Sequence, residues 1–397
     1  MKELRFDIVP GLNCNFRCQY CYEKGQYENT KFLLETLEKT IKFILNAYSL
    51  CKKEENDLIL HLYFFGGEPL LYINEICYIV SALAKRIKII NKSYPEGKFK
   101  FIVNITTNGS LVENCFNNLL KLKRKCIPVI NVSYDYFMQN MTRMPGTYDS
   151  VRKSITKLHQ NGFEVKTITT FSTENLKYFY ETVKDYYDFI IDKTNRNNFY
   201  YNIDSSIATK TNVMLNEKEF IESLEKTNEY IKYNNLDKSK IRKNTHCSIT
   251  DGFSRSSLAA KIANNDLEAL KNIYDGTFFA GVFCCIDYSG EIHTGITSLF
   301  VPLKNEFKLG TVNDSPEIII ERYKALVEKI YNGSDMKKTV EKCISCNNDC
   351  KLNYLRTIRN NDILTVHSMP NPEFCRIQDL LSEYNLSQPK DISFYKK

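Results

Sequence analysis

Three cysteines stand close together near the amino terminus, in the segment Cys14-Asn-Phe-Arg-Cys18-Gln-Tyr-Cys21. Three thiolates on one short loop can ligate three irons of a 4Fe-4S cluster, whereas complete ligation takes four cysteines. The next cysteine is Cys51, beyond a predicted helix. The spacing therefore predicts a cluster with one iron left open, as catalytic metal sites leave a position open. Zinc is the alternative, although it favours closed tetrahedral ligation and C-x2-C pairs.

A second group lies near the carboxyl terminus, where Cys343-Ile-Ser-Cys346-Asn-Asn-Asp-Cys350 is followed by Cys375. Four thiolates satisfy a 4Fe-4S cluster completely, so such a cluster could relay electrons or stabilise the fold without binding substrate. A structural zinc site fits the C-x2-C pair equally well. Spacing alone leaves both interpretations open.

The chain has 14 cysteines in 397 residues, and the remaining seven carry a weaker signal. Four are isolated and are expected to be small buried hydrophobic residues, namely Cys51, Cys77, Cys115 and Cys126. Three are intermediate, namely Cys247, Cys284 and Cys285. The amino terminus lacks the apolar core of a signal peptide, so we expect a cytoplasmic protein, in which clustered cysteines indicate metal rather than disulfides.

The elements that must position the first group alternate along the first half of the chain. Five segments have the composition of strands, namely 4–10, 58–65, 99–106, 127–134 and 165–170. Five segments between and after them have helical spacing, namely 32–47, 73–90, 113–122, 147–160 and 176–187. This alternation predicts an α/β fold with parallel strands in an open sheet or partial barrel, whose ligands gather at the carboxyl ends of the strands. The first cysteine group follows the first strand.

After about residue 205 the alternation stops. Residues 215–272 are predicted to be helical, with a polar interruption at 234–247. Residues 282–294 are predicted to form a β-hairpin that turns through Tyr288-Ser289-Gly290-Glu291, and residues 316–331 a helix. A terminal helix is expected from about Cys375. We therefore predict three parts: a barrel domain over 1–205, a helical bridging region over 206–275, and a small cysteine-rich α+β domain over 276–397.

The C-x3-C-x2-C spacing, with Tyr22 after the last cysteine, resembles the signature of radical S-adenosylmethionine (SAM) enzymes. The resemblance implies a partial (β/α)6 barrel and a cluster whose open iron is chelated by the amino and carboxylate groups of SAM. It also implies that one electron from the cluster cleaves the sulfonium to a 5′-deoxyadenosyl radical. The cofactors carry that chemistry, while the protein supplies position and excludes water.

Three further segments resemble motifs of this family, in order and at predicted strand ends: Gly66-Gly67-Glu68-Pro69, Thr106-Thr107-Asn108-Gly109 and Ser133-Tyr134-Asp135. The resemblance implies that the first meets the SAM ammonium through its backbone and acid, that Thr107 and Asn108 belong to the same site, and that Ser133 and Asp135 contact the ribose or the carboxylate.

One departure follows these motifs, because Tyr136 stands where the family often has glycine. Arg143 is the nearest candidate for the arginine that grips the carboxylate, the alternative being a solvated loop arginine.

The carboxyl-terminal part resembles a SPASM domain, which carries two auxiliary 4Fe-4S clusters, but it departs from the pattern. Gly295 stands where a hairpin cysteine belongs, and Tyr354 where a later one does. We therefore expect a trimmed SPASM-like domain with one auxiliary cluster on Cys343, Cys346, Cys350 and Cys375. Cys247, Cys284 and Cys285 could rebuild a second, although neighbours on a strand face opposite sides. Ile296, where sulfatase-maturing relatives place an acid, counts against that activity.

Composition narrows the function classes. With 43% hydrophobic and 25% charged residues, and no stretch of about 18 apolar residues, the chain is predicted to be globular and without a membrane span. Lys+Arg exceed Asp+Glu by 54 − 47 = 7 without a basic stripe, so nucleic-acid binding is not expected. Mild basicity suits a small acidic electron carrier such as a flavodoxin or ferredoxin. We expect a monomer.

The function that this resemblance favours is modification of a ribosomally made peptide or protein side chain by crosslinking, oxidation or epimerisation. The first cluster cysteine is residue 14, so no leader-binding domain is expected before it. Two alternatives stay open: a radical SAM enzyme that acts on a small metabolite, and a zinc-stabilised binding protein without catalysis. The substrate and any catalytic base are not identified by the sequence.

Overall fold

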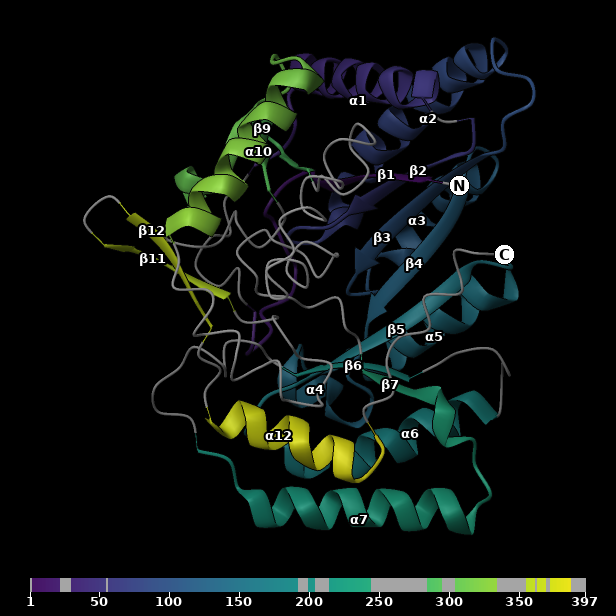
Figure 1. The fold of residues 1–397 in the computed structure, drawn as a ribbon. Helices are drawn as coiled ribbons and strands as arrows, with labels where there is room; N and C mark the ends of the chain where they lie inside the picture. The colour runs from purple at the N-terminus through teal and green to yellow at the C-terminus, as the bar shows by residue number, and fades with distance from the viewer. Residues whose placement is uncertain are drawn as a thin grey trace.

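A computed structural model describes residues 2–21, 30–54, 56–191, 199–203, 214–243, 284–294, 304–333, 355–360, 363–368 and 372–386. Its centre is a sheet whose strands are parallel from β1 to β6 (Figure 1). These strands are β1 (Lys2–Val9), β2 (Leu58–Phe64), β3 (Phe99–Thr107), β4 (Ile127–Ser133), β5 (Glu164–Phe171) and β6 (Phe199–Ile203). The helices that connect them are α1 (Leu34–Glu54), α2 (Ile73–Asn91), α3 (Val112–Lys123), α5 (Tyr148–Gln160) and α6 (Phe179–Ile191).

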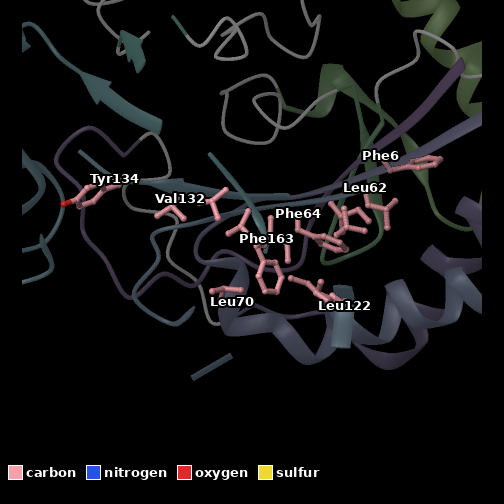
Figure 2. Close-up of a cluster of buried hydrophobic side chains, with 14 of the residues drawn as sticks. Phe6, Leu62, Phe64, Leu70, Leu122, Val132, Tyr134 and Phe163 are labelled. Atoms are coloured by element: carbon pink, nitrogen blue, oxygen red, sulfur yellow. The ribbon is translucent and has the colours of Figure 1, made fainter. Parts of the chain in front are cut away.

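The two faces of the sheet differ because successive side chains of a strand point to opposite sides. On β2, Leu62 and Phe64 pack into the main hydrophobic core together with the helices. Figure 2 shows both side chains among those of this core. The opposite face, here called the inner face, carries Ile59, which forms a small separate cluster with two neighbours, Ile102 and Val129. Farther along the strand the inner face becomes polar, which suits a ligand site at the carboxyl ends of the strands.

The hairpin predicted at 282–294 belongs to the same sheet. Strand β8 (Cys284–Asp287) pairs in parallel with β1, and β9 (Glu291–His293) and β10 (Lys308–Thr311) follow it outward. Gly290 makes the turn with φ +85°, a conformation that glycine adopts without steric cost. Strand β1, which leads into the cysteine loop, is therefore an interior strand of a ten-stranded sheet.

The remaining elements extend or flank this sheet. Strand β7 (Ile241–Lys243) pairs with β6 at the other edge, and α7 (Glu217–Tyr233) precedes it. Arg376 of α12 (Pro372–Glu383) forms an ion pair with Glu217 at 2.6 Å. The other elements are α4 (Gln139–Thr142), α10 (Pro316–Gly333), the β11 (Leu355–Asn360) and β12 (Ile363–Ser368) hairpin, and 3-10 turns at Pro69–Tyr72, Tyr136–Met138, Leu176–Tyr178, Lys238–Lys240 and Lys304–Phe307.

The five strands and five helices predicted for the first half are confirmed, as are the hairpin, the helix from Pro316 and the terminal helix. Ile241–Lys243, which lies inside the polar interruption predicted at 234–247, forms a strand that the sequence did not indicate, because three residues are too few to show an alternating pattern. Residues 244–283 lie outside the described ranges, and the division at 205 and 275 stays a prediction. None of the described helices combines the length and the apolar character that a membrane span requires.

Candidate active site

The three amino-terminal cysteines lie on the loop that follows β1, and each is half-buried. Hydrogen bonds to backbone carbonyls shape this loop, since the Cys21 amide donates to the Cys18 carbonyl at 3.2 Å and the Arg17 guanidinium donates to the Cys14 carbonyl at 2.6 Å. Burial raises the pKa of the Cys14 thiol to about 12 and also raises that of Cys18. Metal ligation requires thiolates, so cluster assembly here must release protons.

The turn after β2 packs directly against the cysteine loop. The Gly67 amide donates to the Gly11 carbonyl at 3.3 Å, and the Glu68 amide donates to the Asn13 carbonyl at 2.7 Å. A Cβ on Gly67 would lie only 2.2 Å from the Asn13 carbonyl oxygen, so a larger residue would push the two segments apart. Gly66 has φ +117°, which disfavours any side chain. The two glycines are thus explained by close backbone approach.

The buried carboxylate of Glu68 joins the ends of β2 and β3. One oxygen accepts hydrogen bonds from the Leu70 amide at 3.0 Å and the Thr107 hydroxyl at 2.7 Å, and the other accepts from the Asn108 amide at 2.7 Å. Burial raises the pKa of Glu68, while the bonds from Asn108 and Thr107 act in the opposite direction. Glu68 therefore fixes the site's framework, and its contact with the SAM ammonium stays a prediction.

The end of β3 also holds the cysteine loop through side-chain amides. Asn108 donates through Nδ2 to Oδ1 of Asn15 at 2.8 Å, and Asn15 donates through Nδ2 to the Ser110 hydroxyl at 2.8 Å. Asn15 lies next to Cys14, so the third strand sets the position of the first cysteine as well as that of Glu68.

The end of β4 reaches the cysteine loop through a buried polar cluster. The carboxylate of Asp135 is fully buried and accepts hydrogen bonds from the Tyr20 hydroxyl at 2.6 Å, the Thr142 hydroxyl at 2.6 Å and the Thr170 amide at 3.2 Å. Arg143 donates through a terminal nitrogen to the Tyr20 hydroxyl at 2.6 Å, and the same nitrogen lies 3.7 Å from Asp135. The three hydrogen bonds that the Asp135 carboxylate accepts in this cluster all come from groups of the protein.

The side chain of Arg143 is only 9% exposed, so it is a buried group and not a solvated loop arginine. Burial by itself would lower the pKa of Arg143, but Tyr20, Cys18 and Asp135 raise it, so the guanidinium stays charged. Its Nε–H has no hydrogen-bond partner among the residues that the structure describes. A buried donor without a partner is costly, which favours an acceptor supplied by a ligand.

The structure thus brings most of the predicted site residues together around one loop. The amino-terminal cysteines, Glu68, Thr107, Asn108, Asp135 and Arg143 are joined by the bonds described above, while Pro69 opens the buried turn after Glu68. Ser133 ends β4 half-buried, and its contact with a ligand stays a prediction. The sequence did not single out Tyr20 or Thr142. The position of Tyr20 between two cluster cysteines was the available signal.

The second cysteine group lies largely outside the residues that the structure describes. Cys247, Cys343, Cys346 and Cys350 lie outside the described residues, and Cys375 is placed only as a backbone position on α12. The auxiliary cluster therefore stays a prediction. Cys284 and Cys285 do face opposite sides of β8, as predicted: Cys284 lies in the main core, and Cys285 packs with Val9 and Leu12.

A polar network lines the inner face below the cysteine loop. The Tyr63 hydroxyl accepts a hydrogen bond from Nδ2 of Asn131 at 3.1 Å and bonds to the Thr106 hydroxyl at 3.2 Å. Arg5 lies over the Tyr63 ring, 4.9 Å from its centroid, and pairs with Asp7 at 2.8 Å. The same face carries Glu3 beside His61, and Lys166 paired with Glu164 at 3.3 Å. Ion pairs therefore lie on this face together with neutral hydrogen-bonding groups.

Residues 8–186 match the family model described as the radical SAM superfamily. No curated protein matches the sequence. Among solved structures, anSMEcpe with bound AdoMet has a TM-score of 0.60 at 14% identity, covering 99% of this chain and 98% of that chain. The same protein with AdoMet and the Kp18Cys peptide gives the same values. SuiB of Streptococcus suis bound to S-adenosylmethionine covers 87% of this chain and 69% of its own, with a TM-score of 0.47 at 17% identity.

At 14% identity this similarity establishes a shared fold, and it extends over nearly the whole chain. The predicted α/β partial barrel with a smaller carboxyl-terminal part is therefore confirmed as the fold class.

Proposed function

Because residues 8–186 match the radical SAM superfamily model, we propose that this chain is a radical SAM enzyme that uses a 4Fe-4S cluster and SAM to modify a side chain of a peptide or protein. The observation that carries the proposal is the loop with Cys14, Cys18 and Cys21, held on three sides by the ends of β2, β3 and β4.

The residues fit this pair of cofactors. Three thiols on one loop leave one iron without a protein ligand, and Arg143 offers a buried N–H and a positive charge suited to a carboxylate. When bound, the cluster and SAM supply a 5′-deoxyadenosyl radical by one-electron cleavage of the sulfonium. Arg143 would bind the SAM carboxylate, and the backbone at Gly66 and Gly67, together with Glu68, would bind the ammonium.

The inner face supports a peptide as the substrate. Its Arg5–Asp7 and Lys166–Glu164 ion pairs are each neutral, and Oδ1 of Asn104, a residue only 3% exposed, lacks a hydrogen-bond partner within the described ranges. Neutral hydrogen-bonding groups suit the backbone amides of a peptide better than the full charges of a small zwitterion. The fold neighbour anSMEcpe was crystallised with a peptide, which adds support by analogy.

The remaining parts of the proposal concern electrons. We propose that Cys343, Cys346, Cys350 and Cys375 hold one auxiliary 4Fe-4S cluster, and that a flavodoxin- or ferredoxin-type protein supplies the electron. Four ligands would leave that cluster no open iron, so electron relay or stabilisation is its expected role.

Anaerobic reconstitution tests the proposal. We expect about eight irons per chain, two clusters of four, and release of 5′-deoxyadenosine when SAM and dithionite are added. Replacing Cys18 with Ala should abolish that release, because the cluster loses a ligand. Cys77→Ala is the matched control, since Cys77 is also half-buried but lies on α2 away from the loop, and it should keep both iron and release.

Different outcomes refute different parts of the proposal. A protein that binds zinc and no iron, or that releases no 5′-deoxyadenosine, would exclude radical SAM chemistry. A count near twelve irons, three clusters of four, would instead exclude the single auxiliary cluster. Co-expression with a short open reading frame from the adjacent gene, analysed by mass spectrometry, tests crosslinking or oxidation of a peptide substrate through a change in peptide mass.

A further inference from the structure

The phenol of Tyr20 bridges two charged groups that come from a distant part of the chain. Its hydroxyl donates to Oδ2 of Asp135 at 2.6 Å and accepts from Arg143 at 2.6 Å. Tyr20 lies between Cys18 and Cys21, whereas Asp135 and Arg143 follow β4. One hydroxyl therefore connects the cluster loop to the residues at the end of the fourth strand.

A second tie beside the hydroxyl makes this connection rigid. The Gln19 amide donates to the Thr142 carbonyl at 2.9 Å, and the Gln19 side chain donates to the Met141 carbonyl at 2.9 Å. The segment with Gln19 and Tyr20 thus runs against the segment with Thr142 and Arg143. Both Gln19 bonds would persist without the phenol, so removal of the hydroxyl isolates its own effect.

The bridge decides which way the guanidinium of Arg143 points. Its terminal nitrogen stays 3.7 Å from Asp135 because the Tyr20 hydroxyl lies between the two groups. The hydroxyl accepts a hydrogen bond from Arg143 and donates one to Asp135. The guanidinium is a planar fork, so fixing one terminal nitrogen also fixes Nε. That Nε–H is buried and unpartnered within the described part of the chain.

Without the phenol, the guanidinium and the Asp135 carboxylate would be free to pair directly. A bidentate contact is the preferred geometry of an arginine and a carboxylate, and it uses two N–H groups of the fork. Such a pair would turn Nε away from its present direction. The positive charge of Arg143, which acts to lower the pKa of the nearby Cys18 thiol, would then lose its orientation.

From this geometry we infer that Tyr20 is a positioning residue that holds Arg143 ready for the carboxylate of SAM and keeps it from collapsing onto Asp135. The inference rests on the proposed function. It assigns to the Tyr20 hydroxyl a role in cofactor affinity that acts through Arg143 and requires no contact between the hydroxyl and SAM.

A double-mutant cycle on the reconstituted full chain tests this inference, with SAM binding measured by equilibrium dialysis in the absence of reductant. Tyr20→Phe should raise the Kd for SAM by about tenfold, the effect of one lost charge-assisted hydrogen bond, at unchanged iron content. Arg143→Met should raise it at least as much. In the Arg143→Met background Tyr20→Phe should have no further effect, because the residue through which it acts is gone.

A spectroscopic readout accompanies the binding measurement. The change that SAM produces in the electron paramagnetic resonance spectrum of the reduced cluster should be weakened in Tyr20→Phe at a fixed SAM concentration and recovered at a higher one. Tyr48→Phe is the matched control, because Tyr48 is fully buried and donates a single hydrogen bond to Asn91 at 2.6 Å, between α1 and α2. It should bind SAM as the unmodified protein does.

Three results would overturn the inference. They are an unchanged Kd in Tyr20→Phe, additive effects in the double variant, and loss of iron from Tyr20→Phe, which would show a purely structural role for the phenol. Failure of the unmodified protein to bind SAM or to release 5′-deoxyadenosine would refute the proposed function instead, so the two failures are distinguishable.

Discussion

At the scale of single residues, Tyr136 shows how the site tolerates backbone strain next to Asp135. It has φ +50°, a left-handed conformation that costs a non-glycine residue roughly 1–2 kcal/mol. The ring is fully buried, 4.6 Å from that of Tyr134 and 5.8 Å from that of Tyr186, and the hydroxyl bonds to the Thr167 hydroxyl at 2.7 Å. Burial of an aromatic side chain outweighs strain of that size.

Two substitutions at Tyr136 separate these contributions. Tyr136→Phe should lower the free energy of unfolding by about 1 kcal/mol through the lost hydrogen bond. Tyr136→Gly should lower it by about 2–4 kcal/mol, because the cavity left by the ring costs more than the relieved strain returns. Urea denaturation measures both values. A glycine variant more stable than the original protein would show that the strain dominates.

At the scale of elements, the turn after β2 and the cysteine loop form one packed unit. Gly67→Ala would place a Cβ 2.2 Å from the Asn13 carbonyl oxygen, and backbone atoms cannot yield as a flexible side chain can. We expect less iron bound per chain after reconstitution, since the loop would lose its alignment with the turn.

Gly146→Ala provides the control for this substitution. Gly146 has a positive φ, +75°, unlike Gly67, but a Cβ there would meet nothing within 4 Å. That variant should carry the cost of the left-handed conformation alone, about 1 kcal/mol, with full iron content. Equal iron in both variants would mean that the close approach at Gly67 does not matter for the cluster.

At the scale of the whole molecule, the pairing of β8 with β1 joins the amino-terminal strand to the hairpin at 284–293 in one sheet. Ile286 lies on β8 beside Ile8 of β1 and Ile292 of β9, and all three are fully buried. Ile286→Ala should therefore lower the free energy of unfolding by about 2–5 kcal/mol, as for other buried isoleucines.

The same substitution should destabilise the barrel and the hairpin together. Hydrogen exchange measured by mass spectrometry should show faster exchange of β1 and β2 amides as well as those of β8, because the strands share one hydrogen-bonded ladder. Faster exchange confined to β8 and β9 would show that the hairpin opens independently, which would favour separate folding of the carboxyl-terminal part.

The sequence by itself determined the features whose signal is local. The spacing of Cys14, Cys18 and Cys21, the glycines before Glu68, and the alternation of strands and amphipathic helices all lie within short windows, where period and residue type specify structure directly. The three-residue strand β7 was missed because a period needs more residues than that to be seen.

Only the tertiary structure decided the contacts between distant segments. The Tyr20 hydroxyl meets Asp135, 115 positions away, and β8 pairs with β1 across most of the chain. Neither segment of such a pair carries a mark of its partner, because a hydroxyl can bond to any acceptor and a strand can pair with any edge. Packing of the whole sheet selects the partner, and for that reason the orientation of Arg143 emerged only from the folded chain.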